Sequence, residues 1–260
     1  MSREIKFYKY HGTGNDFILI DDRCKNFNQS ERFISHLCHR QFGIGADGLI
    51  LLQEDREMDF SMKYFNSDGQ ESSMCGNGGR CIAKFAHDLS LIDNLAVFRA
   101  IDGRHEAHVN EEIVELQMNS VKEYEEDNGD IIIDTGSPHF VRRVNELPSN
   151  ELFFRQSREI RYSDRFETEG INVNFYQSIG IISSKTYERG VENETLSCGT
   201  GAVAVALAAH INGDIQQSKA VIKTPGGKLK VSFRPDQGGF DHIWLIGPAV
   251  KVFEGKLYEW

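Results

Sequence analysis

Two short stretches of the chain each place a cysteine in a glycine-rich turn. Residues 72–81 read SSMCGNGGRC, and residues 196–203 read LSCGTGAV. In both, the cysteine precedes a run of small and apolar residues that predicts a helix. The free N–H groups at a helix start bind anions, and the partial positive charge there lowers the pKa of a thiol. Each stretch therefore predicts a reactive thiol, Cys75 or Cys198, beside a site for a carboxylate.

Two such thiols together fit one kind of chemistry. A racemase or epimerase without a cofactor needs a base on one face of a carbon acid and an acid on the other. A thiolate and a thiol meet this need, because one sulfur removes the α-proton while the other returns a proton, and the two titrate as a coupled pair. We therefore expect Cys75 and Cys198 to be the catalytic pair, with the helix starts stabilising the developing negative charge.

The other three cysteines, Cys24, Cys38 and Cys81, are expected to be small buried residues that only pack. An odd total of five cysteines does not predict a disulfide framework in a chain of 260 residues. Because no Cys-x2-Cys pair occurs, a structural zinc site is not expected either.

The two cysteine stretches belong to an internal duplication. Similar features recur at a nearly constant offset of 123 or 124 residues: Cys75 and Cys198, Phe17 and Phe140, Tyr64 and Tyr187, and Gly103-Arg104 and Gly227-Lys228. Ordered matches at a fixed offset predict two copies of one fold. We expect an N-terminal lobe at residues 1–121 and a C-terminal lobe at 122–250.

The elements that would position these residues can be read in both halves. Short β-branched or aromatic runs bounded by Gly, Asn and Asp predict strands. The predicted strands are 5–10, 17–21, 59–65, 96–100, 113–118, 131–134, 140–144, 172–178, 181–187, 220–223, 228–233 and 243–247. Helices are predicted at 30–40, 79–89 and 201–212, and the last is apolar all round, which predicts burial on every side. The acidic stretch 122–130 predicts a solvated loop between the halves.

Composition and charge exclude several classes of function. A net charge of −10 makes binding to nucleic acid or to an anionic membrane surface an improbable main function. The longest apolar run, 202–209, is too short to cross a bilayer, and the first ten residues lack the apolar region of a signal peptide. We therefore expect a cytoplasmic protein.

Several motifs, in order and nearly end to end, closely resemble those of the diaminopimelate epimerases. They are HGTGNDF (11–17), FNSDG (65–69), MCGNGGRC (74–81), GINVNF (170–175), YERG (187–190), SCGTG (197–201), TPGG (224–227) and GPAV (247–250). The resemblance implies a mixed α/β (α+β) fold of two pseudo-symmetric lobes. Each lobe would be a barrel-like, mostly antiparallel sheet around a central helix, with the active site in the cleft between the lobes. The tail, about 251–260, would pack back on the first lobe.

The resemblance also implies an activity. An isomerase of this family interconverts LL-2,6-diaminopimelate and meso-diaminopimelate in lysine and peptidoglycan precursor biosynthesis. It would need no pyridoxal phosphate, other cofactor or metal, and it would form a homodimer, with Phe253 where an aromatic dimer contact is expected.

By the same resemblance, Cys75 and Cys198 are the acid–base catalysts, and His139 lies near them. The substrate-binding positions that it assigns are Asn15, Asn66, Gly76, Asn77, Ser137, Asn172, Glu188, Arg189, Gly199 and Thr200. Backbone N–H groups after each cysteine would bind the reacting α-carboxylate. Arg189 would hold the distal carboxylate in a bidentate fork, and Glu188 would face an ammonium.

Two positions depart from the commoner pattern of the family. Gly48 stands where a substrate-contacting Gln is frequent, and it has no side chain with which to make that contact. Ser137 stands where Asn is frequent, and its hydroxyl can still form a hydrogen bond, although with a shorter reach.

Three alternatives remain open on the sequence. A proline racemase or hydroxyproline epimerase shares the two-thiol chemistry, but it favours MCGHG over MCGNG, and its ring substrate has no second amino-acid end for Glu188 and Arg189. A non-catalytic amino-acid-binding protein of the same fold would not need both cysteines. A thiol redox protein would join Cys75 to Cys198, which would block the site.

Overall fold

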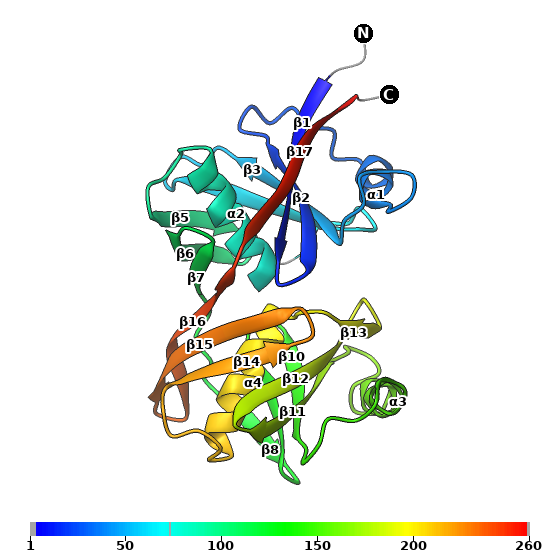
Figure 1. Ribbon diagram of the computed structural model, residues 1–260, viewed down its shortest axis with the longest axis vertical. Helices are drawn as coiled ribbons and strands as arrows, with labels where there is room; N and C mark the ends of the chain where they lie inside the picture. Colours follow the sequence, from blue (N-terminus) through cyan, green and yellow to red (C-terminus); the bar gives the residue numbers. More distant parts are fainter. Residues whose placement is uncertain (1–3, 73, 259–260) are drawn as a thin grey trace. The chain divides into compact units, whose positions relative to one another are not determined.

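The computed structural model of the chain describes residues 4–72 and 74–258. It divides into two compact units (Figure 1). Unit 1 consists of Met1–Leu116 and Gly247–Trp260, and unit 2 consists of Gln117–Ile246. The last segment of the chain thus belongs to the first unit.

Unit 1 is a sheet with two helices. Its elements are β1 (Glu4–Gly12), β2 (Asn15–Asp21), α1 (Glu31–Cys38), β3 (Gly48–Gln53), β4 (Phe60–Asn66), α2 (Gly76–Asp88), β5 (Leu95–Ala100), β6 (Gly103–Asn110), β7 (Ile113–Gln117) and β17 (Val250–Tyr258). The strands pair in the order β17-β1-β2-β3-β4-β5-β6-β7. The β2–β3 and β4–β5 pairs are parallel and the others are antiparallel.

Unit 2 repeats this arrangement. Its elements are β8 (Tyr124–Asp127), β9 (Asp130–Asp134), β10 (Pro138–Arg143), α3 (Asn150–Arg161), β11 (Asn172–Ile179), β12 (Ile181–Glu188), β13 (Asn193–Thr195), α4 (Gly199–Ile211), β14 (Lys219–Thr224), β15 (Gly227–Asp236) and β16 (Gly239–Pro248). The strands pair in the order β8-β9-β10-β11-β12-β14-β15-β16, with β10–β11 and β12–β14 parallel. The short strand β13 also pairs with β12.

The pairing orders of the two units match strand for strand, which confirms the predicted duplication and the mostly antiparallel sheets. One pair of equivalent strands differs in its place along the chain. In unit 1, β17 from the end of the chain pairs with β1, whereas in unit 2, β8 pairs with β9, which directly follows it in the sequence. In Figure 1, β17 runs beside β1, although the two strands come from opposite ends of the sequence.

A central helix packs on the sheet of each unit. In unit 1, α2 packs on β1, β2, β3 and β6, and in unit 2, α4 packs on strands from β9 to β15. Every residue of α4 from Ala202 to Ala209 is buried, as its all-round apolar sequence predicts. Burying a branched side chain such as Val203 or Leu207 contributes about 1.5–3 kcal/mol relative to leaving it in water.

A second helix covers another part of each unit. The apolar stripe of α1, which includes Ile34 and Leu37, packs in one cluster with Leu49 and Leu51 of β3. In unit 2, Phe153 of α3 packs edge-to-face on Phe175 of β11, with ring centroids 5.4 Å apart.

Several elements differ from the sequence predictions. The predicted loop at 122–130 is wrong, since these residues include β8 and the turn at Asn128-Gly129 that leads into β9. The helix α3 and the strand β3 were not predicted. The central helices begin at Gly76 and Gly199, directly after the cysteines, instead of at residues 79 and 201.

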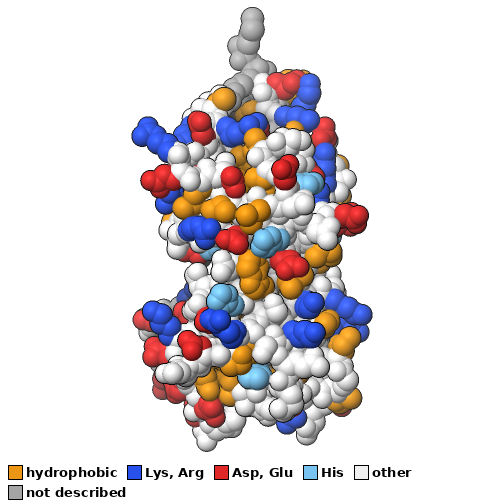
Figure 2. All heavy atoms as spheres, turned by 90° about the vertical axis from the view of Figure 1, so that its left-hand side faces the viewer, with side chains coloured by type: hydrophobic (Ala, Val, Ile, Leu, Met, Phe, Trp, Pro, Cys, Tyr) orange, Lys and Arg blue, Asp and Glu red, His pale blue; other side chains and the backbone are white. Residues whose placement is uncertain are grey.

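The surface carries charges of both signs. On the face drawn in Figure 2, basic and acidic side chains are interspersed over both units. Within the described part of the chain, no helix is long and apolar enough to cross a membrane.

Candidate active site

Cys75 is the N-cap of α2 in unit 1. Its backbone is extended, with φ −95° and ψ 131°, and its carbonyl accepts the first helical hydrogen bond from the N–H of Gly79 at 2.7 Å. The side chain is partly buried. Because no acidic residue lies in the first turn of α2, the positive end of the helix dipole is not offset there by a carboxylate of the helix. This geometry favours an anion at the start of α2.

A chain of amide side chains lies beside this sulfur. Cys75 Sγ donates to Asn15 Oδ1 over 3.7 Å, and Asn77 Nδ2 donates to the same oxygen over 3.1 Å. Asn15 Nδ2 in turn donates to Asp47 Oδ2 at 2.8 Å. Since a carboxylate only accepts, Asp47 fixes the amide of Asn15 with its oxygen toward Cys75.

Asp47 is held by a group of alternating charges. Arg40 bridges Asp47 and Asp16, with N–O distances of 2.7 and 2.8 Å, and the buried Lys9 lies 2.7 Å from Asp16. Burial alone raises the pKa of Asp16, but the hydrogen bonds from Arg40 and Lys9 outweigh it and hold this pKa at about 2. Asp16 is therefore ionised at neutral pH, and Arg40 links it to Asp47, the partner of Asn15.

Cys198 is the N-cap of α4 in unit 2 and has the same extended backbone, with φ −113° and ψ 117°. Its sulfur accepts a hydrogen bond from the N–H of Gly201 at 3.4 Å and lies 3.4 Å from Thr200 Oγ1. Hydrogen bonds donated to a sulfur favour its ionised form. The side chain is buried within the unit, with 8% of its surface exposed.

His139 of β10 connects to this cysteine through Thr200. His139 Nε2 lies 2.9 Å from Thr200 Oγ1, and its Nδ1 lies 2.9 Å from Asn174 Nδ2. Asn174 Nδ2 also donates to the carbonyl of Phe140, which fixes the orientation of that amide. Nδ1 of His139 must then accept, so the neutral ring carries its proton on Nε2 and donates to Thr200. The hydroxyl proton of Thr200 is left for Cys198 Sγ.

Burial keeps His139 neutral. The ring is fully buried, and burial, with a smaller contribution from the charge of Arg189, lowers its pKa to about 3. His139 therefore acts at neutral pH as a hydrogen-bond donor through Nε2 and does not carry a charge.

Ser137, Asn172 and Arg189 meet at the edge of the same unit. Asn172 Nδ2 donates to Ser137 Oγ at 2.8 Å and to the carbonyl of Pro138, while Asn172 Oδ1 accepts from the backbone N–H of Arg189 at 2.9 Å. The hydroxyl of Ser137 thus accepts a hydrogen bond that holds the side chain of Asn172 in place. The guanidinium of Arg189 donates to the carbonyl of Glu169 and is exposed, and Glu188 is partly buried at the end of β12.

The remaining cysteines separate into two groups. Cys38 and Cys81 are buried, and burial raises the pKa of each thiol to about 12, which fits the predicted packing role. Cys24 is exposed, so the prediction that it packs as a small buried residue is wrong.

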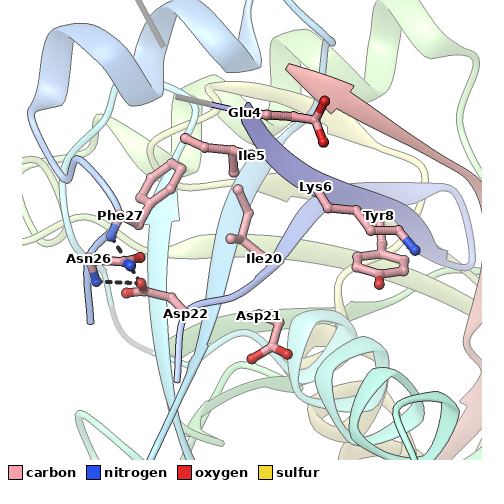
Figure 3. A pocket seen from close by; sticks show the side chains of 9 residues that line it. All are labelled: Glu4, Ile5, Lys6, Tyr8, Ile20, Asp21, Asp22, Asn26 and Phe27. Carbon is pink, nitrogen blue, oxygen red and sulfur yellow. Dashed lines mark hydrogen bonds between the residues drawn. The ribbon is translucent and has the colours of Figure 1, made fainter. Parts of the chain in front are cut away.

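One pocket of about 250 Å³ lies elsewhere in unit 1, on β1 and the end of β2 (Figure 3). Its carboxylate Asp22 already accepts the backbone N–H groups of Asn26 and Phe27, at 2.8 and 2.9 Å. Because Cys75 and the amide chain do not line it, this pocket is separate from the candidate site. The residues that the structure describes include no cluster of three or more His, Cys, Asp or Glu suited to a metal ion.

Comparison with known proteins identifies the family. The model of the diaminopimelate epimerase family matches residues 7–124 and 131–252. The chain belongs to this family. A diaminopimelate epimerase from Flavobacterium psychrophilum is 49% identical over 257 residues, which cover 97% of this chain and 100% of that protein. The diaminopimelate epimerase from Aquifex aeolicus is 36% identical and covers 98% of both chains.

Solved structures share the duplicated fold at low identity. A PhzF-family phenazine biosynthesis protein from Bacillus anthracis has a TM-score of 0.74 at 14% identity, covering 98% of this chain and 99% of its own. A hydroxyproline epimerase from Agrobacterium vitis has a TM-score of 0.70 at 15% identity, covering 98% and 93%. At these identities the likeness concerns the fold alone.

Gly48, the first of the two positions where the sequence predicts a departure from the family pattern, has little room for a side chain in this structure. A Cβ at Gly48 would lie 2.6 Å from both the carbonyl oxygen of Phe65 and the ring of Tyr64. The Tyr64 side chain thus occupies the space next to this position, and a larger residue at 48 would require it to move. Asn66, at the end of β4, is exposed.

Three polar residues beside the cysteines were not predicted from the sequence: Asp47, Arg80 and Asn174. Asn174 could have been found from strand alternation, because it lies on the same face of β11 as Asn172. Arg80 could have been noticed as a charged residue within the small and apolar start of a helix that is otherwise expected to be buried.

Proposed function

We propose that this protein is an amino-acid epimerase that interconverts LL-2,6-diaminopimelate and meso-diaminopimelate, a step in lysine and peptidoglycan precursor biosynthesis. The observation that carries the proposal is the repeated site. Each of the two like units presents one cysteine as the N-cap of its buried central helix, in a chain that belongs to the diaminopimelate epimerase family.

Cys75 and Cys198 act as a pair on one α-carbon. The thiolate takes the α-proton, so that an S–H bond forms as the C–H bond breaks, and the other thiol gives its proton to the opposite face of the carbanion. The product leaves with the inverted centre, and the two sulfurs have exchanged protonation states. Proton exchange with water restores the starting form.

The starts of the two helices supply the electrostatic part of the mechanism. The backbone N–H groups of Gly76, Asn77, Gly199 and Thr200 lie in the first turns of the two helices and bind the reacting α-carboxylate. As negative charge spreads from Cα into the carboxylate, these donors stabilise it. The neutral His139 supports Cys198 through the Thr200 hydroxyl.

The remaining polar groups select the substrate. Arg189 and Glu188 bind the distal carboxylate and ammonium, and Asn172 with Ser137 holds the backbone at Arg189. Asn15 and Asn66 complete the set from unit 1. No cofactor or metal takes part in the proposed steps. We further propose that the protein works in the cytoplasm as a homodimer, with the exposed Phe253 of β17 in the dimer contact.

A direct assay tests this function. The purified, fully reduced protein is incubated with LL-diaminopimelate, and the isomers are separated by chiral chromatography. We expect meso-diaminopimelate to accumulate to equilibrium. L-proline and trans-4-hydroxy-L-proline, assayed beside it, should not be inverted. Inversion of the ring amino acids without conversion of diaminopimelate would contradict the proposal, as would the absence of any inversion.

A further inference from the structure

Arg80, in the second turn of α2, is a fully buried arginine among neutral groups. None of its side-chain surface is exposed. Nη2 donates to Asn77 Oδ1 at 2.9 Å and to Thr13 Oγ1 at 3.5 Å, and Nη1 donates to the carbonyl of Gly76 at 3.3 Å. Gly12 leaves room for the guanidinium, because a Cβ there would lie 3.0 Å from Nη2.

The charge of Arg80 is not compensated by an acid. Among the described residues, Nε of Arg80 has no hydrogen-bond partner, and the titratable groups that act on its pKa besides burial are the thiols Cys81 and Cys75. Other arginines differ, since Arg40 and Arg142 pair with aspartates at 2.6–2.8 Å. Burial lowers the pKa of Arg80, but a guanidinium remains protonated in proteins. An isolated buried charge is costly, which calls for a functional reason.

The position of this charge points to Cys75. Arg80 holds Asn77 by its amide oxygen, and Asn77 donates to the same Asn15 oxygen that Cys75 Sγ contacts. Beyond Asn15, the charges of Lys9, Arg40, Asp16 and Asp47 are two of each sign and offset one another. Cys81, on the same helix, is neutral because burial raises its pKa to about 12. Within this network of described residues, Arg80 is therefore the charge that no opposite charge offsets.

The duplication provides an internal comparison. The residue 123 positions after Arg80 is Val203, which is buried in α4. Near Cys198, a neutral hydroxyl of Thr200 and the N–H of Gly201 contact the sulfur instead. Unit 1 thus has a buried cation in the network beside its cysteine, where unit 2 has neutral donors.

We propose that Arg80 is a positioning residue that stabilises the thiolate of Cys75 by its buried positive charge and holds the Asn77 amide at the start of α2. The inference rests on the proposed acid–base role of Cys75. In turnover the Cys75 sulfur alternates between the thiolate, which takes the α-proton as the C–H bond breaks, and the thiol. Arg80 favours the thiolate, as an opposite charge nearby lowers the pKa of an acid.

The test compares Arg80→Met with Arg80→Lys in the full chain without substrate. The rate of alkylation by iodoacetamide is followed against pH for each cysteine by peptide mass spectrometry. We expect Arg80→Met to raise the pKa of Cys75 by about one unit or more, which lowers its alkylation about tenfold below that pKa, and Arg80→Lys to restore much of the loss. Cys198 in the same samples should not change. Arg104→Met removes an exposed charge of unit 1 that pairs with Glu106, and it should shift neither thiol.

Asn77→Asp gives an independent variant that keeps Arg80 and gives it a carboxylate partner, so it tests the inference even where Arg80→Met does not fold. It too should raise the pKa of Cys75. An unchanged Cys75 pKa in folded Arg80→Met and in Asn77→Asp overturns the inference, as does an equal shift at Cys198. The readout needs no turnover, so it is separate from the proposed function. A shift in a protein that does not act on diaminopimelate would contradict the function alone, and full activity without a shift would contradict only the role of Arg80.

Discussion

Cys75 and Cys198 occupy the same place in the two units but have different neighbours. Cys75 faces the oxygen of Asn15, in a network that ends at Asp47 on one side and Arg80 on the other. Cys198 faces the hydroxyl of Thr200, which His139 orients. The proposed chemistry is thus symmetric in the two sulfurs, while the groups around them differ.

At this scale we predict that either cysteine is essential for inversion. Cys75→Ala and Cys198→Ala should each lower the epimerisation rate by about 10²–10⁴-fold or more, the range of a single acid–base group, while the variants stay folded. Cys81→Ala is the matched control, because its thiol is buried with a raised pKa and should be needed only for packing. Epimerisation rates measured by chiral chromatography test this prediction. An equal loss of rate in Cys81→Ala would contradict the assignment of Cys75 and Cys198 as the catalytic pair.

The sequence singles out the two cysteines as candidate catalysts but does not mark the groups that surround them. The cysteines stand out because their glycine-rich turn is repeated, and this repeat is visible in the sequence alone. A single sequence does not mark Asp47 or Arg80, because Asp47 contacts the site through Asn15 and Arg80 contacts it through Asn77. Such contacts depend on how the β1–β2 turn meets the start of α2, which spacing along the chain does not specify.

At the scale of elements, β10 and α4 meet through the buried ring of His139, which stays neutral because burial lowers its pKa to about 3. The unfolded chain protonates this histidine near pH 6.5, while the folded protein does not until about pH 3. Between these values the unfolded state binds one more proton, so the stability of unit 2 falls as the pH is lowered.

We therefore predict an acid-sensitive stability that depends on His139. For this group the free energy of unfolding should fall by about 1.4 kcal/mol per pH unit as the pH is lowered below 6.5. His139→Gln should be less stable than the wild type at pH 7 but should lose less stability between pH 6.5 and 4. Urea unfolding at several pH values measures the slope, with the exposed His108→Gln as the control. Equal slopes in the wild type and His139→Gln would contradict this account.

The elements were predictable where one physical signal dominated. The helix α4 is apolar all round, and the alternating strands show their period directly. The strand β3 reads GLILLQ without alternation because it is buried along nearly its whole length, so periodicity could not separate it from a helix. The helix α3 is mostly polar, and its visible signal was the N-cap Ser149, which accepts from the N–H of Leu152.

For the whole molecule, the duplication is complete only when the end of the chain returns to unit 1. The strand β17 pairs with β1 from Glu4 to His11, and Phe253 packs edge-to-face on Phe7 with centroids 6.0 Å apart. In unit 2 the corresponding strand β8 precedes β9 in sequence. The predicted return of the tail depended on the resemblance to the family, because the mixed sequence of residues 250–258 has no strong strand pattern of its own.

We predict that the stability of the fold requires β17 beside β1 but does not require β17 to be at the end of the sequence. A chain that ends at Ala249 should show a lower melting temperature and a tendency to aggregate, because the edge of β1 is left unpaired. A circular permutant that starts at Val250 and joins Tyr258 to Glu4 through an Asn-Gly turn should regain the stability and activity of the full chain. An unfolded permutant, or a truncated chain as stable as the full one, would contradict the prediction.

The central claim, that two sulfurs act on opposite faces of one carbon, is tested most directly by epimerisation in heavy water. The enzyme is mixed with protiated LL-diaminopimelate in deuterium oxide, and both isomers are analysed by mass spectrometry at low conversion. Because the donating thiol carries solvent deuterium, the account predicts one deuterium at the α-carbon of the product, while unreacted substrate keeps its proton. Product that retains the original proton, or substrate that gains deuterium as fast as product, would contradict it.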